Sequence, residues 1–326
     1  MRSIVIALLL FLTVVCHASE TELQVRANTH EKIQRLWKSG DLEEIERIAN
    51  TYREKKMRTP SGLWMRSLVN GALRNVILDT AQREGWSAME DKARAWATRS
   101  PNAPVAQIFL ADVLLSHGFA IRGTDYAYKV PPDQTTEFKR YIRLARSQLE
   151  NTKTIASVDP SWYEFMLNIA QYQSWPASQH EALFTEAVQR EPHFLQTYFV
   201  GSGRFSPKWG GSRDELNAFI TKAVAGLGPT QSDAMYARIH WWIAELRYFD
   251  RFEDAPVDCV RMMRGAKAVV LDYPDQWNIN NFALFAVRCQ DKNAFDYFAK
   301  LIQPKPMMEV WRAPAYFEGA VAWARQ

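Results

Sequence analysis

The chain has 326 residues and a formal net charge of +4, with 12 Trp, 12 Tyr and 17 Phe. Its 40 Lys and Arg residues nearly balance 36 Asp and Glu residues, and no block of five or six basic residues occurs, so nothing indicates a nucleic-acid partner. The length suits one elongated array or two ordinary domains.

The N-terminal stretch has the organisation of a secretory signal peptide. Arg2 provides a positive charge, and residues 4–15 form an apolar run that is too short to span a bilayer comfortably. Residues 16–18 (CHA) fit the small-residue pattern of a signal-peptide cleavage site only loosely. Val15 is bulkier than the residue usual before a lipidated cysteine, so we expect cleavage after residue 18 rather than lipid attachment at Cys16. Residues 1–18 are therefore assigned to a signal peptide, which predicts a periplasmic or secreted protein.

Beyond this segment, apolar residues recur at spacings of three and four, which places them on one side of a helix. No alternating strand pattern of useful length competes, so we predict an all-α fold in which most aromatic rings pack between helices. No second run of 18 apolar residues occurs, and we expect no transmembrane segment in the mature chain. The clearest stripes contain Leu42, Ile45 and Tyr52; Trp86, Met89, Ala93 and Trp96; Phe109, Val113 and His117; Phe138, Ile142, Ala145 and Leu149; Leu216, Phe219 and Val224; and Ile239, Trp242 and Leu246.

Helix breakers separate these stripes at short intervals. The pairs Asp159-Pro160 and Glu191-Pro192 stand 32 residues apart, and each is expected to open a helix. A period in the low thirties, built from helix–turn–helix units, resembles the tetratricopeptide repeat. We therefore expect antiparallel helix pairs stacked as an α-solenoid, with an N-terminal helical region at residues 19–100 and a tetratricopeptide-like domain at residues 101–326.

Three short strings carry a closer resemblance. Residues 122–124 (RGT), 207–212 (PKWGGS) and 236–241 (YARIHW) are similar to segments of a bacterial family of tetratricopeptide-like proteins that is described only as a domain of unknown function. The likeness covers about residues 100–325. It implies a helical-repeat fold but does not imply an activity, because no activity is assigned to that family.

The segment from Pro207 to Glu215 is the most informative local pattern. Ser212 and Glu215 have the spacing of a capping box, and two glycines before them permit a sharp entry into the helix. A small anion could bind at such a turn with help from Lys208 and Arg213, but a well-capped structural turn with Trp209 packed against the helices is the favoured interpretation.

No arrangement of residues indicates a metal, cofactor or nucleophile site. The histidines beyond residue 18 are scattered, without an i,i+4 pair or a paired Cys-x-x-Cys, and we expect neither zinc nor a cofactor. His240, beside two tryptophans, is interpreted as a packed core residue. Ser202 lies between two glycines but lacks the strand-to-helix context of a hydrolase.

The sequence therefore favours a protein- or peptide-binding module without enzymatic activity. The alternative is a cell-envelope hydrolase that acts on glycan or peptide through carboxylates. Convergent carboxylates or a buried His–carboxylate pair in a groove would favour the hydrolase, and an aromatic, basic groove would favour binding. The candidate ligand-binding residues, chosen because they interrupt the stripes, are Arg122, Tyr126, Tyr128, Lys208, Trp209 and Arg213.

Cys259 and Cys289 are the two cysteines that remain after residue 18, and export would expose them to an oxidising compartment. The helices around them should fold back at Tyr273-Pro274, with one cysteine 14 residues before Tyr273 and the other 16 after it. At about 1.5 Å per residue these distances place the cysteines at similar levels of the hairpin. We predict a Cys259–Cys289 disulfide, with two buried free thiols as the alternative.

Overall fold

The computed structural model of the protein describes residues 20–123, 129–246, 248–249 and 251–326. These residues are mainly helical, and they contain no β-strand beyond one isolated bridge between Arg58 and Trp64. The all-α prediction is confirmed. The helices are α1 (Glu22–Ser39), α2 (Leu42–Glu54), α3 (Met65–Glu84), α4 (Trp86–Arg99), α5 (Pro104–Arg122), α6 (Pro132–Asn151), α7 (Lys153–Ala156), α8 (Ser161–Tyr172), α9 (Ala177–Arg190), α10 (Leu195–Gly203), α11 (Arg213–Val224), α12 (Pro229–Glu245), α13 (Cys259–Asp272), α14 (Gln276–Arg288), α15 (Lys292–Ala299), α16 (Met308–Trp311) and α17 (Pro314–Arg325).

Capping interactions set many of the helix boundaries. Gly40 adopts a left-handed conformation with φ of 76° and ends α1. Asp41 then accepts a hydrogen bond of 3.2 Å from the Glu44 amide and begins α2. Aspartates cap three later helices in the same way: Asp258 for α13, Asp275 for α14 and Asp291 for α15.

One expected boundary is wrong. α8 begins at Ser161, directly after Pro160, as predicted, but α10 begins only at Leu195, beyond Pro192. The Tyr198 hydroxyl donates to the Pro192 carbonyl at 2.8 Å. This bond holds the proline-containing turn against the first turns of α10, so the proline belongs to the connection and not to the helix.

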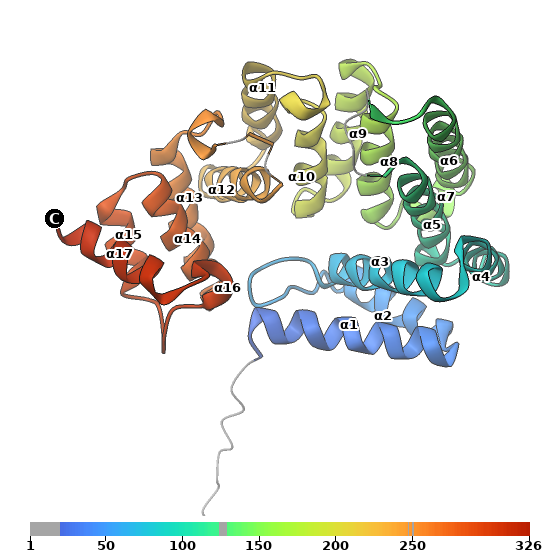
Figure 1. Ribbon diagram of the computed structural model, residues 1–326, viewed down its shortest axis with the longest axis horizontal. Helices are drawn as coiled ribbons and strands as arrows, with labels where there is room; N and C mark the ends of the chain where they lie inside the picture. The colour runs from blue at the N-terminus through green and yellow to red at the C-terminus, as the bar shows by residue number, and fades with distance from the viewer. Residues whose placement is uncertain (1–19, 124–128, 247, 250) are drawn as a thin grey trace, which may run out of the picture.

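The helices follow a curved path that returns toward its start (Figure 1). α5 packs on α6, α12 on α13, α14 on α15 and α1 on α3. Gly265 permits the close approach of α13 to α12, because a Cβ there would overlap the Asp233 carbonyl. At the end of the path, α14 lies beside the loop between α2 and α3 and also contacts α1. The protein is thus an arc of helices whose first and last parts meet.

Aromatic side chains fill the spaces between neighbouring helices. Trp37, Trp96 and Phe109 join α1, α4 and α5, with ring centroids 5.1 to 6.2 Å apart. Phe184 of α9 and Phe219 of α11 meet edge to face at 4.9 Å. Such contacts combine a large buried area with a defined geometry. The expected packing role therefore applies to many of the rings.

Helix α5 is long and mainly apolar. Among the described residues it alone is long and apolar enough to cross a membrane by length and composition. Its apolar stretch is, however, 78% buried inside the protein, between α3, α4, α6 and α8. A buried core helix meets the same length and composition criteria, and that is the position of α5 in this fold.

The predicted cysteine pair is joined. Cys259 and Cys289 form a disulfide with their Cα atoms 5.6 Å apart. Cys259 is the first residue of α13 and Cys289 directly follows α14, so the bond closes the open end of the α13–α14 hairpin.

Replacing both cysteines, with C259S and C289S combined, should lower the free energy of unfolding by about 3–4 kcal/mol, because the unfolded chain loses a cross-link. Urea unfolding of the variant and of the oxidised wild-type protein measures this difference. Intact-mass spectrometry should show the unreduced protein about 2 Da lighter than its reduced form. Two alkylatable thiols in denatured, unreduced protein would contradict the prediction.

Candidate functional site

The two ends of the arc meet at residues 55–64, the loop between α2 and α3. The Ser61 amide donates to Glu22 Oε2 at 2.8 Å, and the Ser61 carbonyl accepts from Arg238 Nη2 at 2.6 Å and from Asn278 Nδ2 at 3.1 Å. All four residues are buried, so these bonds form away from water, where an unpaired polar group is costly. We refer to Glu22, Ser61, Arg238 and Asn278 as the Ser61 seam.

The same loop is also attached to the connection between α9 and α10. Trp64 Nε1 and Arg58 Nη1 both donate to the His193 carbonyl, at 2.8 and 3.1 Å. Lys56 forms an ion pair of 2.8 Å with Glu191. The loop therefore contacts three later parts of the chain, and its position depends on tertiary contacts.

Gly62 permits this close approach. Its φ is 90°, and a Cβ at this position would lie 2.8 Å from Arg238 Nη2 and 2.8 Å from the Tyr273 ring. A side chain at residue 62 would therefore be unfavourable both for the backbone and for the contact with α12.

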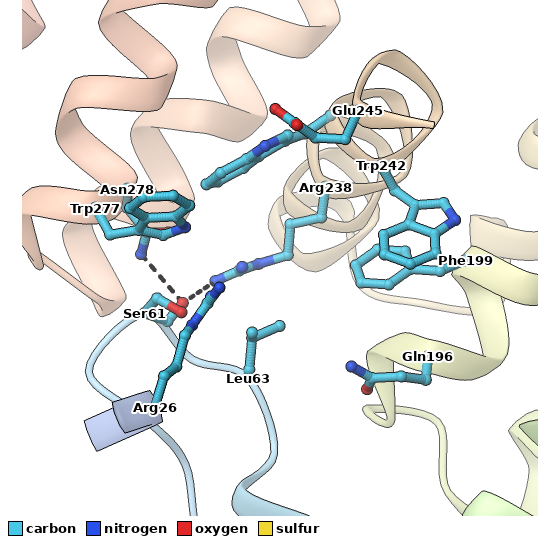
Figure 2. Close-up of a pocket in the computed structure, with 11 residues that line it drawn as sticks. Arg26, Ser61, Leu63, Gln196, Phe199, Arg238, Trp242, Glu245, Trp277 and Asn278 are labelled. Atoms are coloured by element: carbon cyan, nitrogen blue, oxygen red, sulfur yellow. Dashed lines mark hydrogen bonds between the residues drawn. The ribbon is translucent and has the colours of Figure 1, made fainter. Parts of the chain in front are cut away.

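A cavity of about 250 Å³ lies against the Ser61 seam (Figure 2). Its walls come from α1, the 55–64 loop, α10, α12 and α14, which are distant in the sequence and adjacent only because the arc closes. We call it the seam pocket. Its lining residues are Arg26, Ser61, Leu63, Gln196, Phe199, Arg238, Trp241, Trp242, Glu245, Trp277 and Asn278.

Aromatic rings form two walls of the seam pocket. Trp242 stacks on Phe199, with ring centroids 5.1 Å apart and planes at 11°. Trp277 lies on the opposite side in Figure 2, and its ring centroid is 6.3 Å from that of Trp241. Rigid aromatic faces of this kind bind apolar or flat groups with little loss of side-chain entropy.

Two of the three charged side chains that line the pocket, those of Arg26 and Arg238, are cationic. Burial lowers the pKa of Arg238 to about 10, which still leaves it protonated at neutral pH. The Arg26 guanidinium lies 5.1 Å from the Trp277 ring, and its Nε donates to Glu22 Oε1 at 2.6 Å. Glu245 is exposed at the rim. The pocket thus offers aromatic faces and hydrogen-bond donors, with a single carboxylate in its lining.

A second cavity, of about 590 Å³, continues from the seam pocket toward the C-terminus and shares Trp277 and Glu245 with it. We call it the C-terminal groove. The two cavities are therefore adjacent. The other lining residues are Asn281, Leu284, Val287, Arg288, Glu309, Val310, Trp311, Arg312, Ala315, Tyr316, Gly319, Ala320 and Trp323.

A separate group of charged residues connects α3 with α5. Arg74 of α3 forms an ion pair with Asp112 of α5, which is 3% exposed. Burial raises the pKa of the Asp112 carboxyl, and the Arg74 charge opposes that shift.

The same face of α3 meets α8 in a similar way. Arg66 Nε donates to Asp159 Oδ2 at 2.6 Å, and Asn70 Nδ2 donates to Glu164 Oε2 at 3.3 Å. Burial raises the pKa of Glu164 to about 7, although Arg66 and Arg74 favour its charged form. Asp112 also raises the Glu164 pKa by charge repulsion, so the two carboxylates lie near one another.

Of the residues predicted to bind ligand, the four that lie in the described part of the chain do not line either cavity. Arg122 ends α5 and lies 5.8 Å from the Phe138 ring, and Trp209 lies 5.4 Å from the Tyr172 ring. Phe119 contacts both Phe138 and Tyr172, so a chain of rings connects these two candidates. Lys208 is exposed beside Trp209. Tyr126 and Tyr128 lie outside the described residues.

Arg213 lies apart from the other candidates, with its Nη2 directed to the Ala255 carbonyl at 3.4 Å. At the turn before Arg213, one of the two bonds of the predicted capping box forms: Ser212 Oγ accepts from the Glu215 amide at 3.1 Å. The reciprocal arrangement occurs instead at Thr21 and Gln24, at the start of α1.

His240 and His117 both have packed surroundings. His240 is 1% exposed, and burial lowers its pKa to about 3. His117 Nδ1 lies 2.6 Å from Glu90 Oε1, with the ring stacked on Trp86 at 4.7 Å. This His–carboxylate pair lies outside the lining of both cavities. No group of three or more potential metal ligands occurs among the residues that the structure describes.

The predicted stripes include Trp242 as a packing residue and omit Trp241, Trp277 and Phe199, because the spacing of apolar residues shows which of them share a helix face and not whether that face lines a cavity. Trp241 and Trp242 are consecutive, so they point about 100° apart and cannot both lie at the centre of one face. Arg238 stands within the otherwise mainly apolar stretch 235–244. These two signals could have identified α12 as a wall of a site.

No protein-family model, no curated protein and no solved structure matches the chain. The resemblance to a tetratricopeptide-like family therefore stays a prediction.

Gly62→Ala should destabilise the protein more than Gly40→Ala. Both glycines have a positive φ, which costs about 1 kcal/mol or more in any L residue, but a Cβ at Gly40 meets nothing within 4 Å. The added overlap at residue 62 should cost about 1–3 kcal/mol further. Urea unfolding measures the difference, and small-angle scattering should show a larger radius of gyration for Gly62→Ala alone. If the two substitutions lowered the free energy of unfolding equally, the close contact of Gly62 with Arg238 and Tyr273 would be contradicted.

Glu164→Gln should stabilise the protein at pH 8 by on the order of 1–2 kcal/mol and have little effect at pH 4. The folded pKa of about 7 exceeds the ordinary value of 4.5, so the wild-type protein loses stability as pH rises between these values. Glutamine removes this dependence and can still accept from Asn70. Thermal unfolding of both proteins from pH 4 to 8 measures how the stability of each depends on pH. If the two stabilities changed in parallel with pH, Glu164 would titrate normally.

Proposed function

We propose that the protein is an exported interaction protein of tetratricopeptide-like α-solenoid architecture that binds a peptide segment of a partner. The segment would lie in the seam pocket and extend into the C-terminal groove. Successive packed helices, curved into an arc, support the architectural part of the proposal. The partner is expected to be a protein or peptide.

The composition of the seam pocket is the observation that carries this proposal. Trp241, Trp242, Trp277 and Phe199 provide aromatic surface, and Arg26 and Arg238 provide donors. Tryptophan and arginine are the side chains that most often dominate binding energy at protein interfaces. An aromatic and basic groove is also the arrangement that favours binding over hydrolysis.

Export is supported by the disulfide, because such bonds persist in oxidising compartments. The intact mass that reports the disulfide also reports the N-terminus of the mature chain. A mass that corresponds to a first residue near Ser19 would support cleavage, and a diacylated Cys16 would exclude it.

A cell-envelope hydrolase is the second candidate, and Asp112 and Glu164 favour it. A carboxyl with a pKa of about 7 has the protonation expected of a general acid. Against this, Asp112 is held in an ion pair with Arg74, and its side chain is only 3% exposed. Soluble fragments released from purified cell-wall sacculi by the wild-type protein, but not by Glu164→Gln, would support hydrolysis. No release would exclude that activity on cell wall.

Trp277→Ala should weaken peptide binding at least about tenfold, because Trp277 contributes to both cavities. A display library of random 12-residue peptides is selected on the wild-type protein, and the dissociation constants of enriched peptides are measured by fluorescence anisotropy.

Tyr297→Ala is the matched control, since Tyr297 is an aromatic residue of α15 that is 38% exposed and lies outside both cavities. It should bind peptides as the wild-type protein does. Enrichment of no peptide, or equal binding by a folded Trp277→Ala variant, would overturn the proposed function.

A further inference from the structure

The positive charge of the buried Arg238 guanidinium is the feature of the seam pocket that the proposed function does not use. Arg238 is 8% exposed and lines the pocket. Its Nη2 donates to the Ser61 carbonyl, a neutral acceptor. Within the described part of the chain, no carboxylate lies at ion-pair distance from it. A buried charge is costly unless it is paired, so an anion bound beside Arg238 would stabilise the site.

Arg26 brings a second cation to the same corner. Figure 2 shows the guanidinium groups of Arg26 and Arg238 pointing to one place beside Ser61. Glu22 is the nearby carboxylate, and both of its oxygens are engaged: Oε1 accepts from Arg26 at 2.6 Å and Oε2 from the Ser61 amide at 2.8 Å. Asp272 also attracts the Arg238 charge and Asp275 the Arg26 charge, but neither carboxylate forms an ion pair with these guanidinium groups in the described part of the chain.

The walls next to this corner are apolar. Trp277 lies directly over Arg26, and Trp241, Trp242 and Leu63 complete the surface around it. A ligand that satisfies both features has an anionic group attached to an apolar or aromatic group. Guanidinium groups bind carboxylates especially well, because paired N–H donors match the two oxygens.

We propose that the seam pocket recognises a carboxylate that adjoins an apolar or aromatic side chain, with the carboxylate bound by Arg26 and Arg238 and the side chain packed against Trp277. This inference rests on the proposed function and specifies its ligand. A peptide offers this chemistry in two ways, at its free C-terminus or at an acidic residue beside an apolar one.

Three short peptides distinguish these cases. Acetyl-Ala-Ala-Phe carries a free C-terminal carboxylate, acetyl-Ala-Ala-Phe-amide is its neutral match, and acetyl-Ala-Asp-Phe-amide carries only a side-chain carboxylate. Isothermal titration calorimetry at low ionic strength should show at least one acidic peptide binding about tenfold or more tightly than the neutral amide. The tighter of the two acidic peptides identifies the source of the carboxylate.

Arg26→Gln tests the assignment to this corner. The Arg26 side chain is 34% exposed, so its replacement should leave the fold intact. The preference for the acidic peptide should fall below about threefold in this variant. Arg35→Gln changes an exposed arginine of the same helix outside the pocket and should keep the full preference. Arg238→Gln should act like Arg26→Gln if it folds, as judged by circular dichroism.

Equal binding of the acidic and neutral peptides by the wild-type protein would overturn this inference while leaving peptide binding in place. A preference retained by Arg26→Gln would overturn it too. Failure of all three probes to bind would overturn it, and enrichment of peptides from the random library would then show that the proposed function stands without it.

Discussion

The peptide group of Ser61 is the contact on which the rest of the site depends. Its N–H and carbonyl are held by residues 39, 177 and 217 positions away, and Glu22 and Asp275, 253 positions apart, share another bond beside it. The entropic cost of closing so long a loop grows slowly with length, by about 0.6 kcal/mol per doubling. A few buried hydrogen bonds can therefore offset the added cost of joining the ends of the arc. Without them, the walls of the seam pocket would separate.

Local packing and long-range closure contribute differently to this fold. Each helix is stabilised mainly by its neighbours through rings such as Trp96 and Phe109, and such contacts alone would allow many curvatures. The hydrogen bonds of the Ser61 seam stabilise the curvature at which the two ends of the arc meet. Arg238 has a central part, because it both secures the loop and contributes charge to the pocket. Its structural role and its proposed ligand-binding role would thus be combined in one side chain.

The chemistry of the seam pocket differs from that of the charged group on α3, α5 and α8. In the pocket, two cations and four aromatic rings surround open space. In the charged group, Arg66 and Arg74 are already paired with Asp159 and Asp112, which joins α3 to the turn before α8 and to α5. The first arrangement has unused binding capacity, and the second is largely satisfied within the protein. This contrast makes peptide binding the better supported of the two functions.

The sequence by itself determined those features that depend on short separations. The helical class follows from spacings of three and four, the break at residues 39–41 from glycine and aspartate capping, and the disulfide from two nearly equal distances to one turn. The seam pocket could not be found in this way, since Arg26, Leu63, Phe199 and Trp277 belong to four separate segments. Residues that interrupt a stripe, such as Trp209, gave no guide to it. Only the closure of the arc brings the lining residues together, because curvature is the sum of many small rotations between helices, and no local pattern records that sum.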